Sequence, residues 1–75
     1  MTAREWIAAY AELLGVEPPS AEEFTAILDL AAEAAHASER VAAPVACWLA
    51  AGSEGTLEES LALARQVAPG AGGAE

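Results

Sequence analysis

The sequence contains no lysine, and its cationic side chains are limited to three arginines, against twelve aspartate and glutamate residues. The formal net charge is −9 at pH 7. Nucleic-acid binding draws its affinity from phosphates neutralised by lysine and arginine, and anionic membrane surfaces attract the same residues. We therefore expect the chain to bind neither nucleic acid nor a membrane.

Cysteine and long apolar runs are also scarce. Cys47 is the sole cysteine, so an intrachain disulfide cannot form. No apolar run approaches the roughly 20 residues that a membrane-spanning helix requires. Met1–Glu5 shows no basic segment leading into a signal peptide. These features favour a cytoplasmic protein.

Large apolar residues are few, and alanine is abundant in their place. Hydrophobic residues make up 55% of the 75-residue chain, but 21 of them are alanine. A chain of this length forms one small domain that buries only about 60% of the surface of its unfolded form. Close helix contacts through alanine, or a second copy of the chain, would complete the burial.

Three capping boxes mark three helix starts. In each, a hydroxyl residue accepts a hydrogen bond from an amide of the first turn, and a glutamate three positions later reaches back to the cap amide. An apolar segment with the 3.6-residue period of a helix follows each pair. The pairs are Thr2/Glu5, Ser20/Glu23 and Thr56/Glu59.

Glycine and proline set the remaining boundaries. Gly15 suits the end of the first helix, and Pro44 disfavours a helical conformation in the residue before it, so that a short third helix begins there. The sequence predicts an all-α, compact four-helix domain with short loops. Its helices are expected at about 3–14, 21–41, 44–51 and 57–68, in a single domain at 1–68 followed by a disordered tail at 69–75.

Few aromatic residues are available to fill a core, so we expect Trp6, Tyr10, Phe24 and Trp48 to lie inside it. Leu30 and Leu63 fall on the flanks of the inner stripes of their helices. An apolar patch on a small protein often marks an interface. Both leucines are therefore interface candidates, and we expect a homodimer or an interface with another protein.

Glu33 and His36 lie one helical turn apart, a spacing that supplies half of a carboxylate di-iron site. The chain has a single histidine, so only a homodimer could complete such a site. We expect no metal here, and a helix surface or a ligand or partner contact instead. Cys47 lies between an alanine and a tryptophan, so we expect it to be a small buried hydrophobic residue rather than a nucleophile. We expect no enzymatic activity and no cofactor.

None of the three arginines has an acidic residue three or four positions away. Their partners must lie in other helices, at helix carbonyl ends, or in another molecule. Arg40 is expected near the end of the second helix, where the dipole favours a cation. The alternative is a ligand or partner contact, beside His36, at the corner that Pro44 creates.

The segment from Ala34 to Pro44 reads Ala-Ala-His, then Arg, then Ala-Ala-Pro, and Leu49-Ala50-Ala51-Gly52 follows it. With Trp6 and the corner Leu14-Gly15-Val16, this pattern resembles a small bacterial domain of unknown function, over about residues 3–68. Domains of that family occur as free-standing chains or behind a domain resembling the molybdenum cofactor guanylyltransferases. The resemblance implies an accessory role near molybdenum cofactor maturation or its dependent enzymes. It marks His36, Arg40 and Pro44 as motif positions without a known role.

The sequence therefore favours a non-catalytic helical interaction module, with contact residues His36, Arg40, Pro44 and Glu33. Its expected partner is another protein, for which the resemblance implies a molybdenum cofactor guanylyltransferase or a molybdoenzyme, or a second copy of the chain. Two alternatives stay open. One is a purely structural homo-oligomer, and the other is a small metal- or ligand-binding protein that uses Glu33 and His36.

Overall fold

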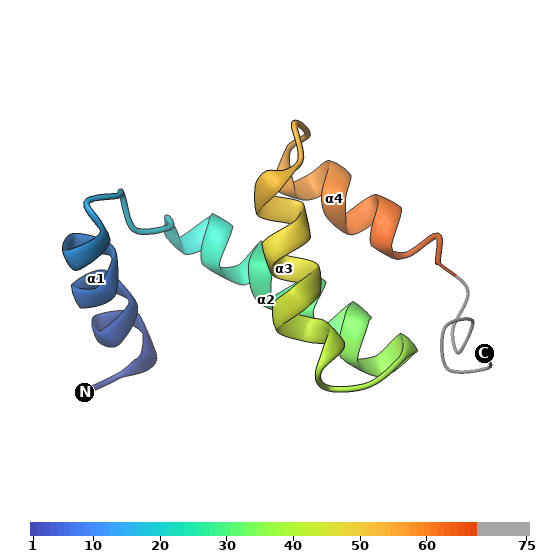
Figure 1. The fold of residues 1–75 in the computed structure, drawn as a ribbon, viewed down its shortest axis with the longest axis horizontal. Coiled ribbons are helices and arrows are strands. Elements are labelled where there is room, and N and C mark those ends of the chain that lie inside the picture. Colours follow the sequence, from blue (N-terminus) through green and yellow to red (C-terminus); the bar gives the residue numbers. More distant parts are fainter. Residues whose placement is uncertain (68–75) are drawn as a thin grey trace.

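A computed structural model of the chain describes residues 1–67, which form four helices and no strand. The helices are α1 (Ala3–Leu14), α2 (Ala21–Ala37), α3 (Ala42–Gly52) and α4 (Leu57–Ala64) (Figure 1). The predicted all-α four-helix fold is confirmed. None of these helices is both long and apolar enough to cross a membrane. The predicted tail at 69–75 lies outside the described residues.

All three predicted capping boxes are formed, at the starts of α1, α2 and α4. In each box the hydroxyl oxygen accepts a hydrogen bond from the glutamate amide at 3.1 Å, and the glutamate carboxylate accepts one from the cap amide at 2.8 Å. Gly15 ends α1 in the left-handed conformation, with φ at 76°, and its amide donates to the carbonyls of Ala11 and Glu12. These boundaries follow from local chemistry alone.

The predicted end of the second helix at residue 41 is corrected, because α2 ends at Ala37. Ser38 leaves the helical region with φ at −138° and ψ at −106°, and α3 begins at Ala42. Pro44 is thus the third residue of α3. Amides in the first turn have no partner within the helix, so proline is tolerated there without loss of a hydrogen bond. Helix α4 also ends early, at Ala64 rather than at residue 68.

Helix α2 is the central element, and both α3 and α4 pack on it (Figure 1). Leu30 of α2 is 3% exposed and lies at the centre of this packing. The side of α3 that faces α2 carries small residues, and Cys47 Sγ lies 3.9 Å from the carbonyl oxygen of Ile27. Small side chains allow the two backbones to approach closely, as the alanine content predicts.

Helix α1 lies at one end of the molecule, beyond the start of α2 (Figure 1). The guanidinium of Arg4 lies 4.3 Å from the centroid of the Phe24 ring on α2, a cation–π contact. The rings of Trp6 and Tyr10 are tilted and 5.2 Å apart. The radius of gyration is 13.3 Å, compared with about 11 Å for a globular chain of this length. The position of α1 at one end of the molecule contributes to the difference.

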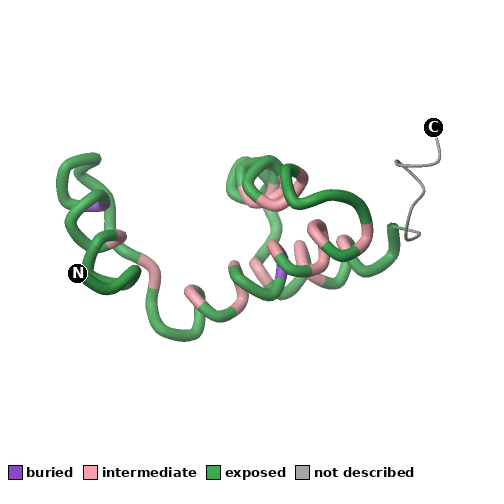
Figure 2. Tube along the Cα trace, turned by 90° about the horizontal axis from the view of Figure 1, so that it is seen from below, coloured by how far each residue is buried: buried purple, intermediate pink, exposed green. Residues whose placement is uncertain are grey.

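Most of the described residues are exposed to solvent (Figure 2). Only Ala11 and Leu30 are buried among residues 1–67. The expectation of an aromatic core is wrong for Trp6, Tyr10 and Trp48, which are exposed, while Phe24 is half-buried. The reason is that α1 stands at one end and α3 and α4 leave their outer sides uncovered. No further layer of the chain covers these rings within the described part.

Candidate functional site

Helix α3 contains no charged residue, unlike each of the other three described helices. A helix that is apolar on all sides is normally buried on all sides. Here one side, rich in alanine, is half-buried toward α2, and the other side is open. The α3 surface, as we call it, consists of this open side and of Val41, the residue before α3. Its residues are Val41, Pro44, Val45, Trp48 and Leu49.

Trp48 lies on the α3 surface and is 76% exposed, more than any other aromatic residue among residues 1–67. It follows Val41 and Val45 at the spacing of one helical face. Tryptophan is enriched among the residues that dominate protein–protein binding. Sequence reasoning assigned Trp48 to the core and missed this surface. The available signal was the uncharged run from Val41 to Ser53 in a chain so rich in acids.

A groove between α3 and α4 adjoins the α3 surface. Leu30 and Ala34 of α2 line it, together with Leu49, Leu63 and Val67. The structure thus brings together the two predicted interface residues, Leu30 and Leu63, but in different settings. Leu30 is buried and belongs to the core, whereas Leu63 is exposed and available to a partner. Leu49 belongs to both features, so the α3 surface and the groove are continuous.

Arg40 lies beside a shallow hollow at the start of α3, lined by Glu39, Arg40, Val41 and Pro44. His36 is exposed on the last turn of α2 and is not among the lining residues. The predicted corner of His36, Arg40 and Pro44 is thus assembled only in part. Within residues 1–67, Arg40 makes no side-chain hydrogen bond and no ion pair.

Glu33 is bound by Arg65, the residue that follows α4, rather than by His36 of α2. Its Oε2 accepts a hydrogen bond from Arg65 Nε at 3.3 Å. Arg65 thus finds its partner on another helix. The same is true of Arg4, which lies over the ring of Phe24 on α2. In the part of the chain that the structure describes, no three histidine, cysteine, aspartate or glutamate residues gather as metal ligands. The Glu33–His36 pair therefore gains no third ligand from residues 1–67.

Cys47 is half-buried on the side of α3 that packs on α2. Burial raises the pKa of its thiol above the ordinary value, because the thiolate is poorly solvated there. A nucleophilic cysteine requires the opposite shift, toward the thiolate at neutral pH. The position favours a packing role.

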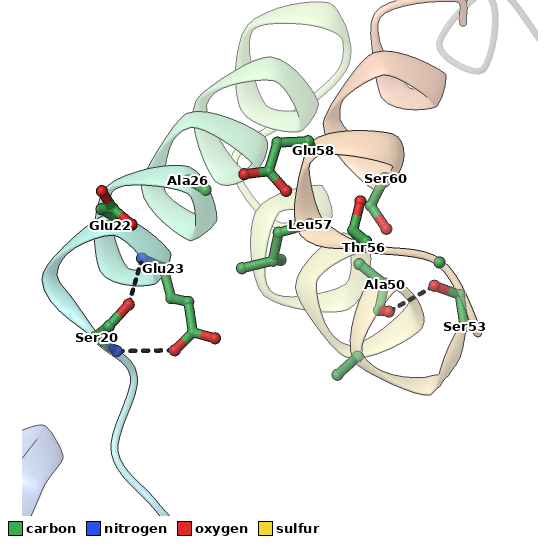
Figure 3. Close-up of a pocket in the computed structure, with 12 residues that line it drawn as sticks. Ser20, Glu22, Glu23, Ala26, Ala50, Ser53, Thr56, Leu57, Glu58 and Ser60 are labelled. Atoms are coloured by element: carbon green, nitrogen blue, oxygen red, sulfur yellow. Dashed lines mark hydrogen bonds between the residues drawn. The ribbon is translucent and has the colours of Figure 1, made fainter.

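A second hollow lies between the starts of α2 and α4, and Figure 3 shows its lining. Glu22, Glu23 and Glu58 contribute to it, and Glu23 is bound back to the amide of Ser20. Residues of α2 and α4 meet here only because both helices pack in the fold, so the sequence alone did not indicate the hollow. The acids give it a negative character that the α3 surface does not share.

Residues 1–73 match a family model described as a domain of unknown function, DUF6457. No curated protein and no solved structure shows a significant match to the chain. The matched range contains all four described helices, the α3 surface and the hollow at Arg40. The chain belongs to this family, the domain of unknown function DUF6457.

Proposed function

We propose that the chain is a non-catalytic protein-interaction module and that the α3 surface is its contact site. The observation that carries the proposal is a helix without charge whose open side presents Trp48 at 76% exposure. Contiguous apolar surface on a small protein is typical of interaction sites. Because such surface is costly to hydrate, a partner that covers it gains free energy from its burial.

Arg40 and Pro44 extend the contact site at the start of α3. Arg40 has no partner among the described residues, and Val41 and Pro44 of the α3 surface line the hollow beside it. Arginine at the edge of an apolar site supplies directional donors, and it is enriched with tryptophan in binding hot spots. His36, in the last turn of α2, is a peripheral contact in this arrangement.

The class of partner is a separate part of the proposal. The likeness of residues 34–44 and 49–52 to domains found behind a molybdenum cofactor guanylyltransferase-like domain supports a partner in molybdenum cofactor maturation. Such a partner would be a guanylyltransferase of that kind or a molybdoenzyme. The chain would then act as an accessory, contributing a binding surface and no reacting group.

The experiment is an affinity capture from the native host with three baits: wild type, Arg40→Ala and Arg4→Ala. Each variant loses one arginine, and Arg4 lies on α1, away from the α3 surface. We expect the Arg40→Ala bait to lose a molybdenum cofactor enzyme that the other two retain, with an unchanged melting temperature. A sharp drop in the melting temperature of Arg40→Ala would show a structural role for Arg40 and contradict the proposal.

A further inference from the structure

We propose that the α3 surface is the interface of a homodimer in which two α3 helices pack antiparallel about a two-fold axis. The inference rests on the proposed function, because it names a second copy of the chain as the occupant of the same surface. A molybdenum cofactor enzyme would then bind this surface only in competition with the second copy. Three features of the chain point to a second copy as that occupant: the distribution of charge, the symmetry of two charged residues about α3, and the surface area that one copy leaves open.

The distribution of charge restricts where two copies can meet. Each copy carries a net charge of −9, so two copies repel one another over most of their surfaces. Acidic residues occur in α1, α2 and α4 and are absent from α3. Contact through α3 therefore buries apolar side chains, and the nearest acids, Glu39 and Glu54, lie beyond the two ends of the helix.

Glu39, Arg40 and Glu54 are the charged residues nearest to α3 in the sequence, and Arg40 and Glu54 are placed symmetrically about it. Arg40 lies two residues before the first residue of α3, and Glu54 lies two residues after the last. In an antiparallel pair of helices related by a two-fold axis at their midpoint, the start of one helix lies beside the end of the other. Arg40 then faces Glu54 of the partner subunit, and the pairing occurs twice.

Neither residue is engaged by another side chain of the described part of one copy. Across residues 1–67, the structure shows no side-chain hydrogen bond and no ion pair for Arg40 or Glu54, and both are exposed. The same axis passes near the middle of α3, so Trp48 lies close to the centre of the contact. Hot-spot residues are typically found at the centre of an interface, with polar groups at its rim.

The surface area agrees with a dimer. The chain exposes 5798 Å², whereas a folded monomer of this mass exposes roughly 4,300 Å². The difference is about 1,500 Å². Helix α1, which stands at one end of the molecule, exposes part of this excess, and the α3 surface with the adjoining residues of the groove exposes another part. Obligate homodimers bury about 1,000 to 2,500 Å² per subunit, so the excess is large enough to include such an interface.

The first test is the mass in solution, measured by sedimentation equilibrium on wild type, Trp48→Glu and Leu13→Glu. Leu13 is a matched control, because it is an apolar residue of α1 that is 87% exposed. We expect a mass twice that of the 7.6 kDa chain for wild type and Leu13→Glu, and a mass of one chain for Trp48→Glu. Far-ultraviolet circular dichroism shows whether each variant is folded. A wild-type chain that stays monomeric at millimolar concentration overturns the dimer.

The second test is a charge exchange at the two ends of α3, and it does not depend on the folding of Trp48→Glu. Arg40→Glu alone and Glu54→Arg alone should each weaken self-association by about tenfold, because like charges then face one another. The double variant Arg40→Glu/Glu54→Arg should recover most of the wild-type dissociation constant. A double variant no tighter than the weaker single variant overturns the antiparallel arrangement.

Failure of the dimer and failure of the proposed function are distinguishable with a Trp48→Glu bait in the affinity capture. If wild type is monomeric and the captured protein is lost with Trp48→Glu, the surface binds a different protein and only the dimer is overturned. If wild type is monomeric and capture is unchanged by Trp48→Glu and Arg40→Ala, both proposals are overturned.

Discussion

Arg65, the residue that follows α4, forms one contact with Glu33 of α2, with 3.3 Å between Nε and Oε2. Their side chains are 57% and 38% exposed, respectively. The contact uses the carboxylate that the sequence places one turn before His36. In the fold, Glu33 therefore connects α2 to the end of α4. Rules for residues three or four positions apart could not predict this contact, because Glu33 and Arg65 are far apart in the sequence.

The exposure of this ion pair predicts a small effect of its removal. Glu33→Gln should lower the free energy of unfolding by less than about 1 kcal/mol, because water and salt screen an exposed pair. Urea denaturation measures the change. Asp29→Asn is the matched control, since it removes one exposed acid of α2 that has no ion pair among the described residues. A loss of several kcal/mol specific to Glu33→Gln would show that the pair contributes far more than its exposure implies.

The helix starts could be predicted because their chemistry is local. Thr2, Ser20 and Thr56 find their partners three residues later, so the sequence contains the whole motif. The end of α2 could not be placed in this way. Pro44 disfavours a helical conformation at Ala43, yet α3 accommodates Pro44 in its first turn, where amides have no partner within the helix. The helical conformation of α2 ends instead at Ser38.

The candidate site shows the same division between local and tertiary information. Arg40 and Pro44 stand out as a motif, and the structure places both at the start of α3. The exposure of Trp48 depends on which side of α3 faces α2, and on how little of the outer side the other helices cover. The small number of aromatic residues favours a core position for Trp48, and only the arrangement of the helices shows that Trp48 is exposed.

Leu30 should be the most sensitive leucine of α2. Its side chain is 3% exposed and that of Leu28 is 56% exposed. Leu30→Ala should cost about 2–5 kcal/mol of the free energy of unfolding, through lost burial and the cavity left behind. Leu28→Ala, the same substitution on the same helix, should change it by no more than about 0.5 kcal/mol.

Chemical denaturation of the two leucine variants measures both values. In a domain with so few buried side chains, Leu30→Ala is expected to shift the urea midpoint strongly or to leave the chain partly unfolded. Equal effects of the two substitutions would contradict the assignment of Leu30 to the core. If Leu28→Ala lowers the free energy of unfolding more than Leu30→Ala does, a second copy or another partner covers Leu28 under the conditions used.

Cys47 predicts a pH dependence of stability at alkaline pH. Burial raises the pKa of the folded thiol above that of the unfolded chain, so the folded state holds the proton more tightly. The contribution to stability is fully present below the ordinary pKa of the thiol. It is lost progressively as the pH rises from that value through the raised pKa.

The measurement is the urea midpoint of wild type and Cys47→Ala across this alkaline range. Cys47→Ala removes the titrating group, so its midpoint should fall less steeply with pH than that of wild type, whatever the cost of the lost side chain at neutral pH. Alkylation provides an independent check, because thiolate is the reactive species. The native thiol should reach half of its maximal alkylation rate at a higher pH than the same thiol in urea. Parallel midpoint curves and equal alkylation profiles would show that Cys47 is solvated like a surface residue, and would contradict its packing against α2.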